Sequence, residues 1–281
     1  MPVTLVTDSG CDITRSEAAA LGLEIVPIWI IFGEERFRDG IDIDRATFFK
    51  RLGAGEQPKT EPPTQEEFRT VFERVVNAGN EVVCVTLSSG ISQCFANARA
   101  AATSFGERVA VVDSLGASGL ETLLVKYAND LAKPGGSAQE IAKRIAPRAL
   151  KYAAYFAVPD LTMLGRSGRL PKAMVALGSM LNVSLVLKMN EQGAIGPAGQ
   201  SFAFEKTCEI MVDAVVRAIE HSPGARVAFG HVQAPDTAEK LRKLLEEKLG
   251  HPPAQEQVNE ATLTLSAHMG PGAVGVFAIV P

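Results

Sequence analysis

The first half of the chain alternates short apolar runs with amphipathic segments. The apolar runs predict strands over residues 3–7, 25–32, 82–86 and 109–112. Helical spacing and helix-start residues predict helices over residues 15–21, 44–52, 64–79 and 93–104, and after the Ser-x-x-Glu patterns at Ser118 and Ser137. Strands that alternate with helices at this spacing indicate βαβ units and a mostly parallel sheet.

The pattern changes after about residue 150. Further strands are predicted over residues 152–158, 183–189, 226–230 and 274–280, and helices over 205–220, over 237–249 and from Pro171. Strand–turn pairs mixed with helices indicate a mixed sheet. We therefore expect an α/β protein of two domains, residues 1–150 and 151–281. The first has a mostly parallel sheet with flanking helices, and the second is α/β with a mixed sheet.

The composition of the chain argues against several classes of partner and ligand. The formal net charge of −4 argues against nucleic acid and anionic membrane surfaces as partners, because phosphate binding needs a basic face. No apolar stretch is long enough to span a bilayer, and the N-terminus shows no signal-peptide pattern. The four cysteines form no Cys-x-x-Cys pair and the four histidines lack metal-ligand spacing. We expect a cytoplasmic protein without stable membrane insertion, metal or cofactor.

The most informative segment runs from Leu87 to Ser92, between a predicted buried strand and a helix. Such a junction gathers backbone N–H groups, the positive end of the helix dipole and hydroxyl donors, here with Ser89, Gly90 and Ser92 as candidates. No Gly-Lys-Ser/Thr follows, so no lysine is present to meet a triphosphate. The segment predicts a site for a small, singly charged anion such as a carboxylate.

The same segment permits an enzymatic alternative. Residues 90–94 are one residue away from the Gly-x-Ser-x-Gly nucleophile elbow, and Asp160 and either His231 or His268 follow in hydrolase chain order. A serine hydrolase would use Ser92 as its nucleophile. Against it, the last position is Cys94 rather than glycine, and no oxyanion segment is present.

Six motifs in order resemble those of the DegV family. They are residues 6–9 (Val-Thr-Asp-Ser), 60–64 (Thr-Glu-Pro-Pro-Thr), 88–92 (Ser-Ser-Gly-Ile-Ser), 112–114 (Val-Asp-Ser), 164–170 (Leu-Gly-Arg-Ser-Gly-Arg-Leu) and 268–272 (His-Met-Gly-Pro-Gly). The resemblance implies a two-domain α/β protein that binds one long-chain fatty acid and has no catalytic activity of its own. It also implies a fatty acid kinase as partner, which phosphorylates the bound acid.

The resemblance also assigns residues. Thr60 and Ser92 would hydrogen-bond the carboxylate, His268 would lie near it, and Arg169 would lie near both the carboxylate and the kinase-facing surface. Several positions depart from the family pattern: Glu61 and Pro62 replace Ser and Gln, Gln93 and Cys94 replace Gly and Thr, and Ser167 replaces Gly. Glu61 would repel a carboxylate unless its side chain turns outward or is protonated.

An apolar segment after Pro171 is the candidate lining of an acyl tunnel. Met174, Val175, Leu177, Met180 and Leu181 follow helical spacing, and ordinary core packing explains them equally well. The altered residues around Glu61 leave a second binding hypothesis open, in which the chain carries a different anionic amphiphile.

Overall fold

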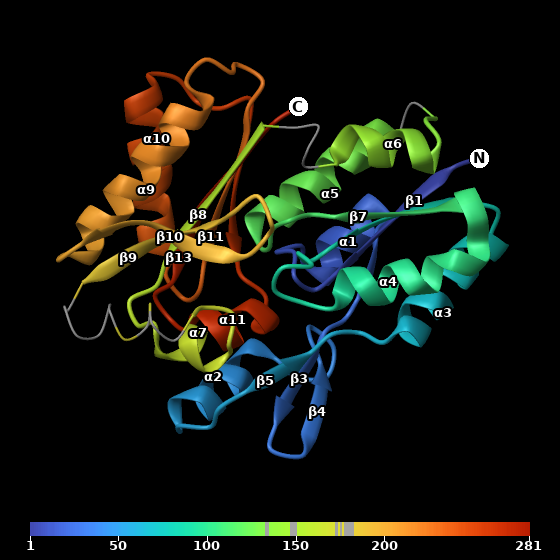
Figure 1. The fold of residues 1–281 in the computed structure, drawn as a ribbon, viewed down its shortest axis with the longest axis horizontal. Coiled ribbons are helices and arrows are strands. Elements are labelled where there is room, and N and C mark those ends of the chain that lie inside the picture. Colours follow the sequence, from blue (N-terminus) through green and yellow to red (C-terminus); the bar gives the residue numbers. More distant parts are fainter. Residues whose placement is uncertain (133–134, 147–150, 172–173, 175, 177–182) are drawn as a thin grey trace.

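The computed structural model describes residues 1–132, 135–146, 151–171, 174, 176 and 183–281. These residues form an α/β fold with a four-stranded, a six-stranded and a small three-stranded sheet (Figure 1). None of the helices in the described ranges has the length and apolarity needed to cross a membrane.

The four-stranded sheet is entirely parallel, as the alternating pattern predicts. Its order is β2 (Glu24–Val26), β1 (Val3–Asp8), β6 (Glu81–Thr86) and β7 (Val109–Asp113). The apolar run over residues 25–32 is not one strand. It divides at Pro27, which lacks an N–H for a sheet ladder, and its second part joins a different sheet.

Helices flank this sheet close to their predicted positions. They are α1 (Arg15–Leu21), α3 (Gln65–Asn77), α4 (Cys94–Ala102), α5 (Gly119–Ala132) and α6 (Ala138–Ile145), with a 3₁₀ segment over Thr103–Arg108. Capping boxes are formed at Thr64 and at Ser137, where the Ser-x-x-Glu pattern predicts one. The one predicted at Ser118 is wrong, because Ser118 has a φ of 56° and its hydroxyl donates to Asp12 instead.

The small antiparallel sheet has the order β4 (Glu35–Arg38), β3 (Trp29–Phe32) and β5 (Lys59–Glu61). Helix α2 (Arg45–Gly53) begins after its N-cap Asp44, whose carboxylate accepts the Thr47 N–H at 2.7 Å. Phe48 of α2 packs in one apolar cluster with Ile30 of β3 and Leu263. Leu263 begins α11 (Leu263–Met269), a short helix that the sequence pattern does not predict.

The six-stranded sheet is mixed, as expected. Its order is β10 (Ile195–Ser201), β9 (Ser184–Met189), β8 (Lys151–Ala157), β13 (Val274–Val280), β11 (Arg226–His231) and β12 (Gln255–Glu260), with only β11 and β12 parallel. Both edge strands escape sequence prediction, because β10 contains glycine and proline and β12 is polar along its length. Helices α9 (Phe204–Ile219) and α10 (Pro235–Leu249) cover its outer face (Figure 1).

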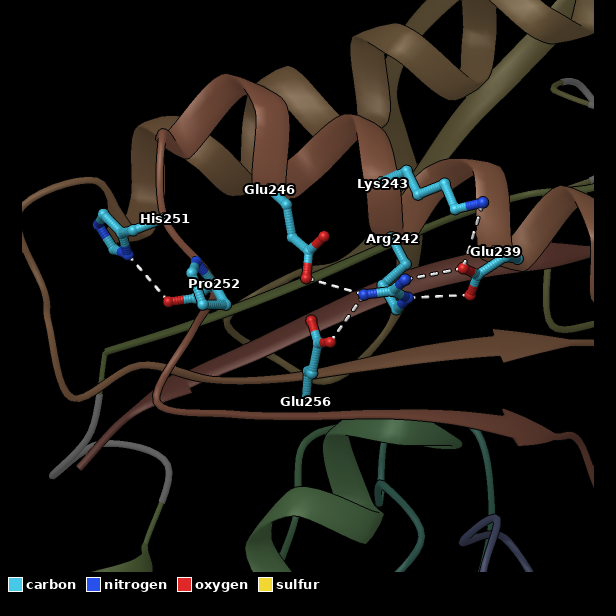
Figure 2. A network of polar contacts seen from close by, with 7 residues as sticks. All are labelled: Glu239, Arg242, Lys243, Glu246, His251, Pro252 and Glu256. Atoms are coloured by element: carbon cyan, nitrogen blue, oxygen red, sulfur yellow. Dashed lines mark hydrogen bonds and ion pairs between the residues drawn. The ribbon is translucent and has the colours of Figure 1, made fainter.

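Ion pairs attach the polar edge strand β12 to α10. Arg242 of α10 contacts Glu239 at 2.8 Å and Glu246 at 2.8 Å on its own helix, and Glu256 of β12 at 2.9 Å (Figure 2). Lys243 lies 3.7 Å from Glu239 at the edge of this network. Charged side chains on an edge strand also disfavour pairing with other chains.

Helix α5 joins the two large sheets. Every described strand before residue 147 belongs to the four-stranded or the small sheet, and every one after residue 150 to the six-stranded sheet. The hydrophobic core does not divide there, because one cluster includes Leu5 and Val85 of the first sheet, Leu124 of α5 and Phe277 of β13. Gly119 permits the close approach, since a Cβ there would lie 2.4 Å from the Phe277 ring.

Buried carboxyl groups gather where β1 ends. Asp8, Asp12 and Glu121 are all fully buried, and Glu121 accepts the Thr7 hydroxyl at 3.0 Å. Burial raises the pKa of Asp8 to about 6 and that of Asp12 to about 7, and raises the pKa of Glu121 well above its ordinary value. The folded state therefore holds more protons than the unfolded chain above about pH 4, where exposed carboxyl groups ionise.

This cluster predicts how stability depends on pH. A carboxyl group whose pKa is higher in the folded state destabilises the protein as pH rises from the unfolded-state pKa towards the folded-state pKa. The unfolding free energy therefore falls between about pH 4 and pH 7. Glu121→Gln keeps an acceptor for Thr7 without a charge, and we expect it to flatten this decline and to exceed the wild type in stability at pH 7. Urea denaturation at several pH values measures both effects. The exposed Glu34→Gln serves as control, and parallel profiles for Glu121→Gln and the wild type would contradict the assignment.

Candidate functional site: an apolar pocket with a half-buried arginine

A pocket lies between the six-stranded sheet, the loop after β6 and helix α11. It encloses about 900 Å³ of space between atoms, its opening included. Most of its wall is apolar and consists of Ile28, Pro62, Leu87, Ile91, Ala117, Phe156, Leu164, Met189, Ile195, Val232, Ala261, Leu265, Met269, Ala273, Val274 and Phe277. Its polar side chains are Thr60, Ser92, Ser118, Arg169, His231, Thr264 and His268. Four of these seven are site residues predicted from the sequence: Thr60, Ser92, Arg169 and His268.

Thr60 and His268 meet across the pocket wall. Thr60 lies on β5, where its side chain alternates with the exposed Lys59 and Glu61, and His268 lies in the last turn of α11. The Thr60 Oγ1 and His268 Nε2 atoms are 2.8 Å apart. Burial, with a smaller contribution from the Arg169 charge, lowers the pKa of His268 to about 3, so the imidazole is neutral at physiological pH. Thr60 and His268, which are 208 positions apart in the sequence, thus form one hydrogen-bonded pair.

Arg169 supplies the positive charge of the pocket. It follows α7 (Thr162–Arg166), and its guanidinium donates to the Ser167 carbonyl at 3.0 Å and to the Ile91 carbonyl at 3.4 Å. Burial lowers its pKa. No acidic side chain of the described residues forms an ion pair with it, and none lines the pocket. A half-buried cation is therefore left with carbonyl dipoles alone as partners.

Ser92 lies on the same pocket wall, just before α4. Its Oγ accepts the Cys94 N–H at 3.2 Å and contacts the Cys94 sulfur at 3.2 Å. The adjacent Ile91 carbonyl receives the Arg169 guanidinium, so the turn before α4 and the arginine segment hold each other in place.

Ser89 and Gly90 do not line the pocket. The expectation of free amide donors in this turn is wrong, because every N–H from Leu87 to Ser92 already has an acceptor. The acceptors are the Asp8 and Asp113 carboxylates, the Gly116 carbonyl and the Ser88 hydroxyl and carbonyl. The local sequence pattern identifies the N–H donors of this turn, but it does not show which acceptors in the folded chain take their hydrogen bonds.

The Ser88–Gly90 turn instead docks on the turn between β9 and β10. The Ser88 hydroxyl donates to the Gly193 carbonyl at 2.7 Å. A Cβ on Gly90 would lie 2.4 Å from that carbonyl oxygen, so only glycine fits this contact. The turn therefore connects the two large sheets and fixes the position from which Ser92 projects.

Glu61 points away from the pocket. Its carboxylate pairs with Arg36 of β4 at 2.8 Å, and half of its side chain is exposed. Strand alternation in β5 explains this arrangement, because Thr60 and Glu61 must face opposite sides. The repulsion expected if Glu61 lay beside a bound carboxylate does not arise in this geometry.

The residues of the hydrolase alternative share the pocket only in part: Ser92, His231 and His268 line it and Asp160 does not, and no hydrogen bond among the described residues joins them. Asp160 accepts hydrogen bonds from Thr162, His268 pairs with Thr60, and the Ser92 hydroxyl bonds to Cys94. His231 accepts the Ala234 N–H through Nδ1. Within the described part of the chain, no group of three or more His, Cys, Asp or Glu side chains has an arrangement suited to a metal ion.

The predicted acyl tunnel falls mostly outside the described residues. Val175, Leu177, Met180 and Leu181 are not described, and neither are most of the other residues from 172 to 182. Met174 is described and packs against the core shared by the two large sheets. The apolar pocket wall was missed by sequence reasoning, because residues such as Phe156 and Phe277 follow the same pattern as any core-facing strand residue.

The fold and the site define an α/β protein with two large sheets and a mostly apolar pocket that contains a half-buried arginine. The chain belongs to the DegV family, whose model matches residues 2–280. A DegV domain-containing protein of Deinococcus radiodurans is 30% identical over 282 residues, which is 98% of each chain. Another, from Halalkalibacterium halodurans, is 28% identical and covers 98% of this chain and 97% of the relative.

Solved structures show the same architecture. A DegV family protein from Thermus thermophilus, described by its fatty acid binding, aligns over 100% of both chains with a TM-score of 0.90 and 29% identity. DegV from Bacillus subtilis, described as a fatty acid binding protein, aligns over 100% of both chains with a TM-score of 0.87 and 26% identity. The α/β fold with one parallel and one mixed sheet is therefore the fold of the family.

Proposed function

We propose that this protein binds one long-chain fatty acid, with its carboxylate beside Arg169 and its acyl chain along the apolar wall. The observation that carries the proposal is the half-buried Arg169 guanidinium, which has no acidic partner among the described residues in a mostly apolar pocket. A buried charge needs a counter-charge and further hydrogen bonds. A fatty acid supplies the anion and the apolar chain in a single molecule.

The neighbouring groups suit a carboxylate. With its proton on Nε2, the neutral His268 donates to Thr60 Oγ1 and leaves the Thr60 hydroxyl proton for the ligand. Ser92, just before α4, offers a second hydroxyl to the pocket. Hydrogen bonds to an ionised group are about twice as strong as those between neutral groups.

The apolar wall provides most of the binding free energy. Burial of an acyl chain gains roughly 0.8 kcal/mol per CH₂, so a chain of about sixteen carbons contributes on the order of 10 kcal/mol before ordering costs. The relatives from Thermus thermophilus and Bacillus subtilis, at 29% and 26% identity, are described as fatty acid binders and support this ligand class. The outward orientation of Glu61 removes the main reason for a different amphiphile.

The account predicts a selective effect of removing the Arg169 charge. Arg169→Met keeps much of the side-chain volume and removes the cation, so we expect palmitate binding to weaken by about 1.5–3 kcal/mol, or roughly tenfold to 150-fold. Binding of the uncharged analogue hexadecanol should change little. Titration calorimetry with both ligands measures the difference, and an equal loss for the two would contradict a role in carboxylate recognition.

We further propose that the protein carries out no reaction itself and presents the bound acid to a fatty acid kinase. A surface depression adjoins the carboxylate end of the pocket and shares Thr60, Arg169 and His268 with it. The exposed Lys59 and Arg166 border this depression, where their charges suit the phosphates of a nucleotide held by the kinase.

The proposal that the protein presents its ligand to a kinase predicts that one variant can slow phosphorylation and still bind the fatty acid normally. Arg166→Ala should leave palmitate affinity unchanged and slow acyl-phosphate formation by a purified fatty acid kinase at least fivefold. Arg217→Ala, an exposed arginine on the distant α9, should change neither quantity. Unaltered phosphorylation in Arg166→Ala would show that this depression does not face the kinase.

A further inference from the structure

Strand β13 contributes one face to the pocket and the other face to the outer core. Successive side chains of a strand point to opposite faces of its sheet. Phe277 and Ile279 belong to the core shared by the two large sheets, so they lie on the inner face, together with Gly275. Val276 and Ala278 belong to the cluster beneath α9 and α10 on the outer face.

Three neighbouring strands form a trough in the inner face of the six-stranded sheet. Gly275 is the register partner of Phe156 on β8 and of Gly230 on β11. All three residues line the pocket. Because two of the three have no side chain, the pocket reaches down to the sheet backbone at this point.

The pocket ends at the next inward-facing position of β13, which is Phe277. Phe277 lines the pocket, whereas its register partners Ala154 on β8 and Ala228 on β11 do not. Ile279, two residues further along β13, does not line it either. The Phe277 side chain therefore separates the trough from the core between β13 and α5.

Three glycines make room for the Phe277 ring in this position. A Cβ on Gly119 of α5 would lie 2.4 Å from the ring Cδ2 atom, and one on Gly275 would lie 2.6 Å from Cζ. A Cβ on Gly230 would lie 3.3 Å from Cε2. The ring is thus enclosed along one edge by backbone from α5, β11 and β13, and it covers Gly275 at the floor of the trough.

We propose that Phe277 closes the inner end of the acyl-binding pocket and sets the length of the fatty acid that the protein binds best. This inference rests on the proposed fatty acid binding and assigns chain selection to a residue that does not recognise the carboxylate. Each methylene group that becomes buried improves affinity about fourfold. A chain that reaches the ring gains nothing from further methylene groups unless the ring is removed.

Shortening residue 277 tests the proposal. Competition against a fluorescent fatty acid gives the relative affinities of myristate, palmitate, stearate and arachidate. In the wild type, affinity should rise with chain length and then level off. In Phe277→Ala the levelling should move to a longer acid, and the ratio of arachidate to myristate affinity should rise about tenfold or more, the effect of two newly buried methylene groups. Phe277→Leu, which preserves more of the core, should shift the ratio in the same direction by less.

Val276→Ala provides the matched control. Val276 is the preceding residue of β13 and is fully buried, but it faces the outer core and does not line the pocket. Its truncation removes apolar volume from the same strand, so it reproduces a general loosening of the sheet. The dependence of affinity on chain length should remain that of the wild type.

The possible failures are distinguishable. A wild-type length dependence in folded Phe277→Leu, or an equal shift in Val276→Ala, would overturn the role of Phe277. Phe277→Leu decides the question if truncation to alanine prevents folding. If the wild type binds none of the four acids, the proposed function itself fails.

Discussion

The arrangement of this site follows from one electrostatic constraint, the guanidinium of Arg169 in a mostly apolar pocket. Carbonyl oxygens of Ser167 and Ile91 orient this group and supply no counter-charge. The neutral His268 and the absence of acidic side chains among the described pocket residues leave the charge available to a ligand. The pocket therefore combines one cation with a mostly apolar wall, the two features that the proposed fatty acid would match.

The fold produces this constraint by bringing together segments that are distant in sequence. The loop after β6 carries Ser92, the small sheet carries Thr60, and α11 returns from the six-stranded sheet to bring His268 against Thr60. Helix α5 makes the two large sheets into one packed body. The Ser88 contact with Gly193 then fixes the loop after β6 against the other sheet. The same packing partly buries Arg169 and places the Thr60 and Ser92 hydroxyls at the pocket.

Much of the fold could be predicted from local pattern. Strands β1, β6 and β13 and helices α1 and α3 follow plain apolar periodicity and capping signals. The failures have specific causes. The Ser118 pattern matches a capping box, but Asp12, distant in sequence, takes its hydroxyl. The polar strand β12 becomes recognisable only through its partners β11 and α10.

The candidate site was predicted in part. Thr60, Ser92, Arg169 and His268, named from the ordered motifs, all line one pocket, while Gly90 lies in the contact between the two large sheets.

Native mass spectrometry of the protein freshly purified from cells tests the central claim most directly. The account predicts one bound long-chain carboxylic acid per chain, released on denaturation and identified by its mass after extraction. A protein that emerges without ligand, or that carries only an uncharged lipid, would contradict the claim that Arg169 and its neighbours form a binding site for a fatty acid.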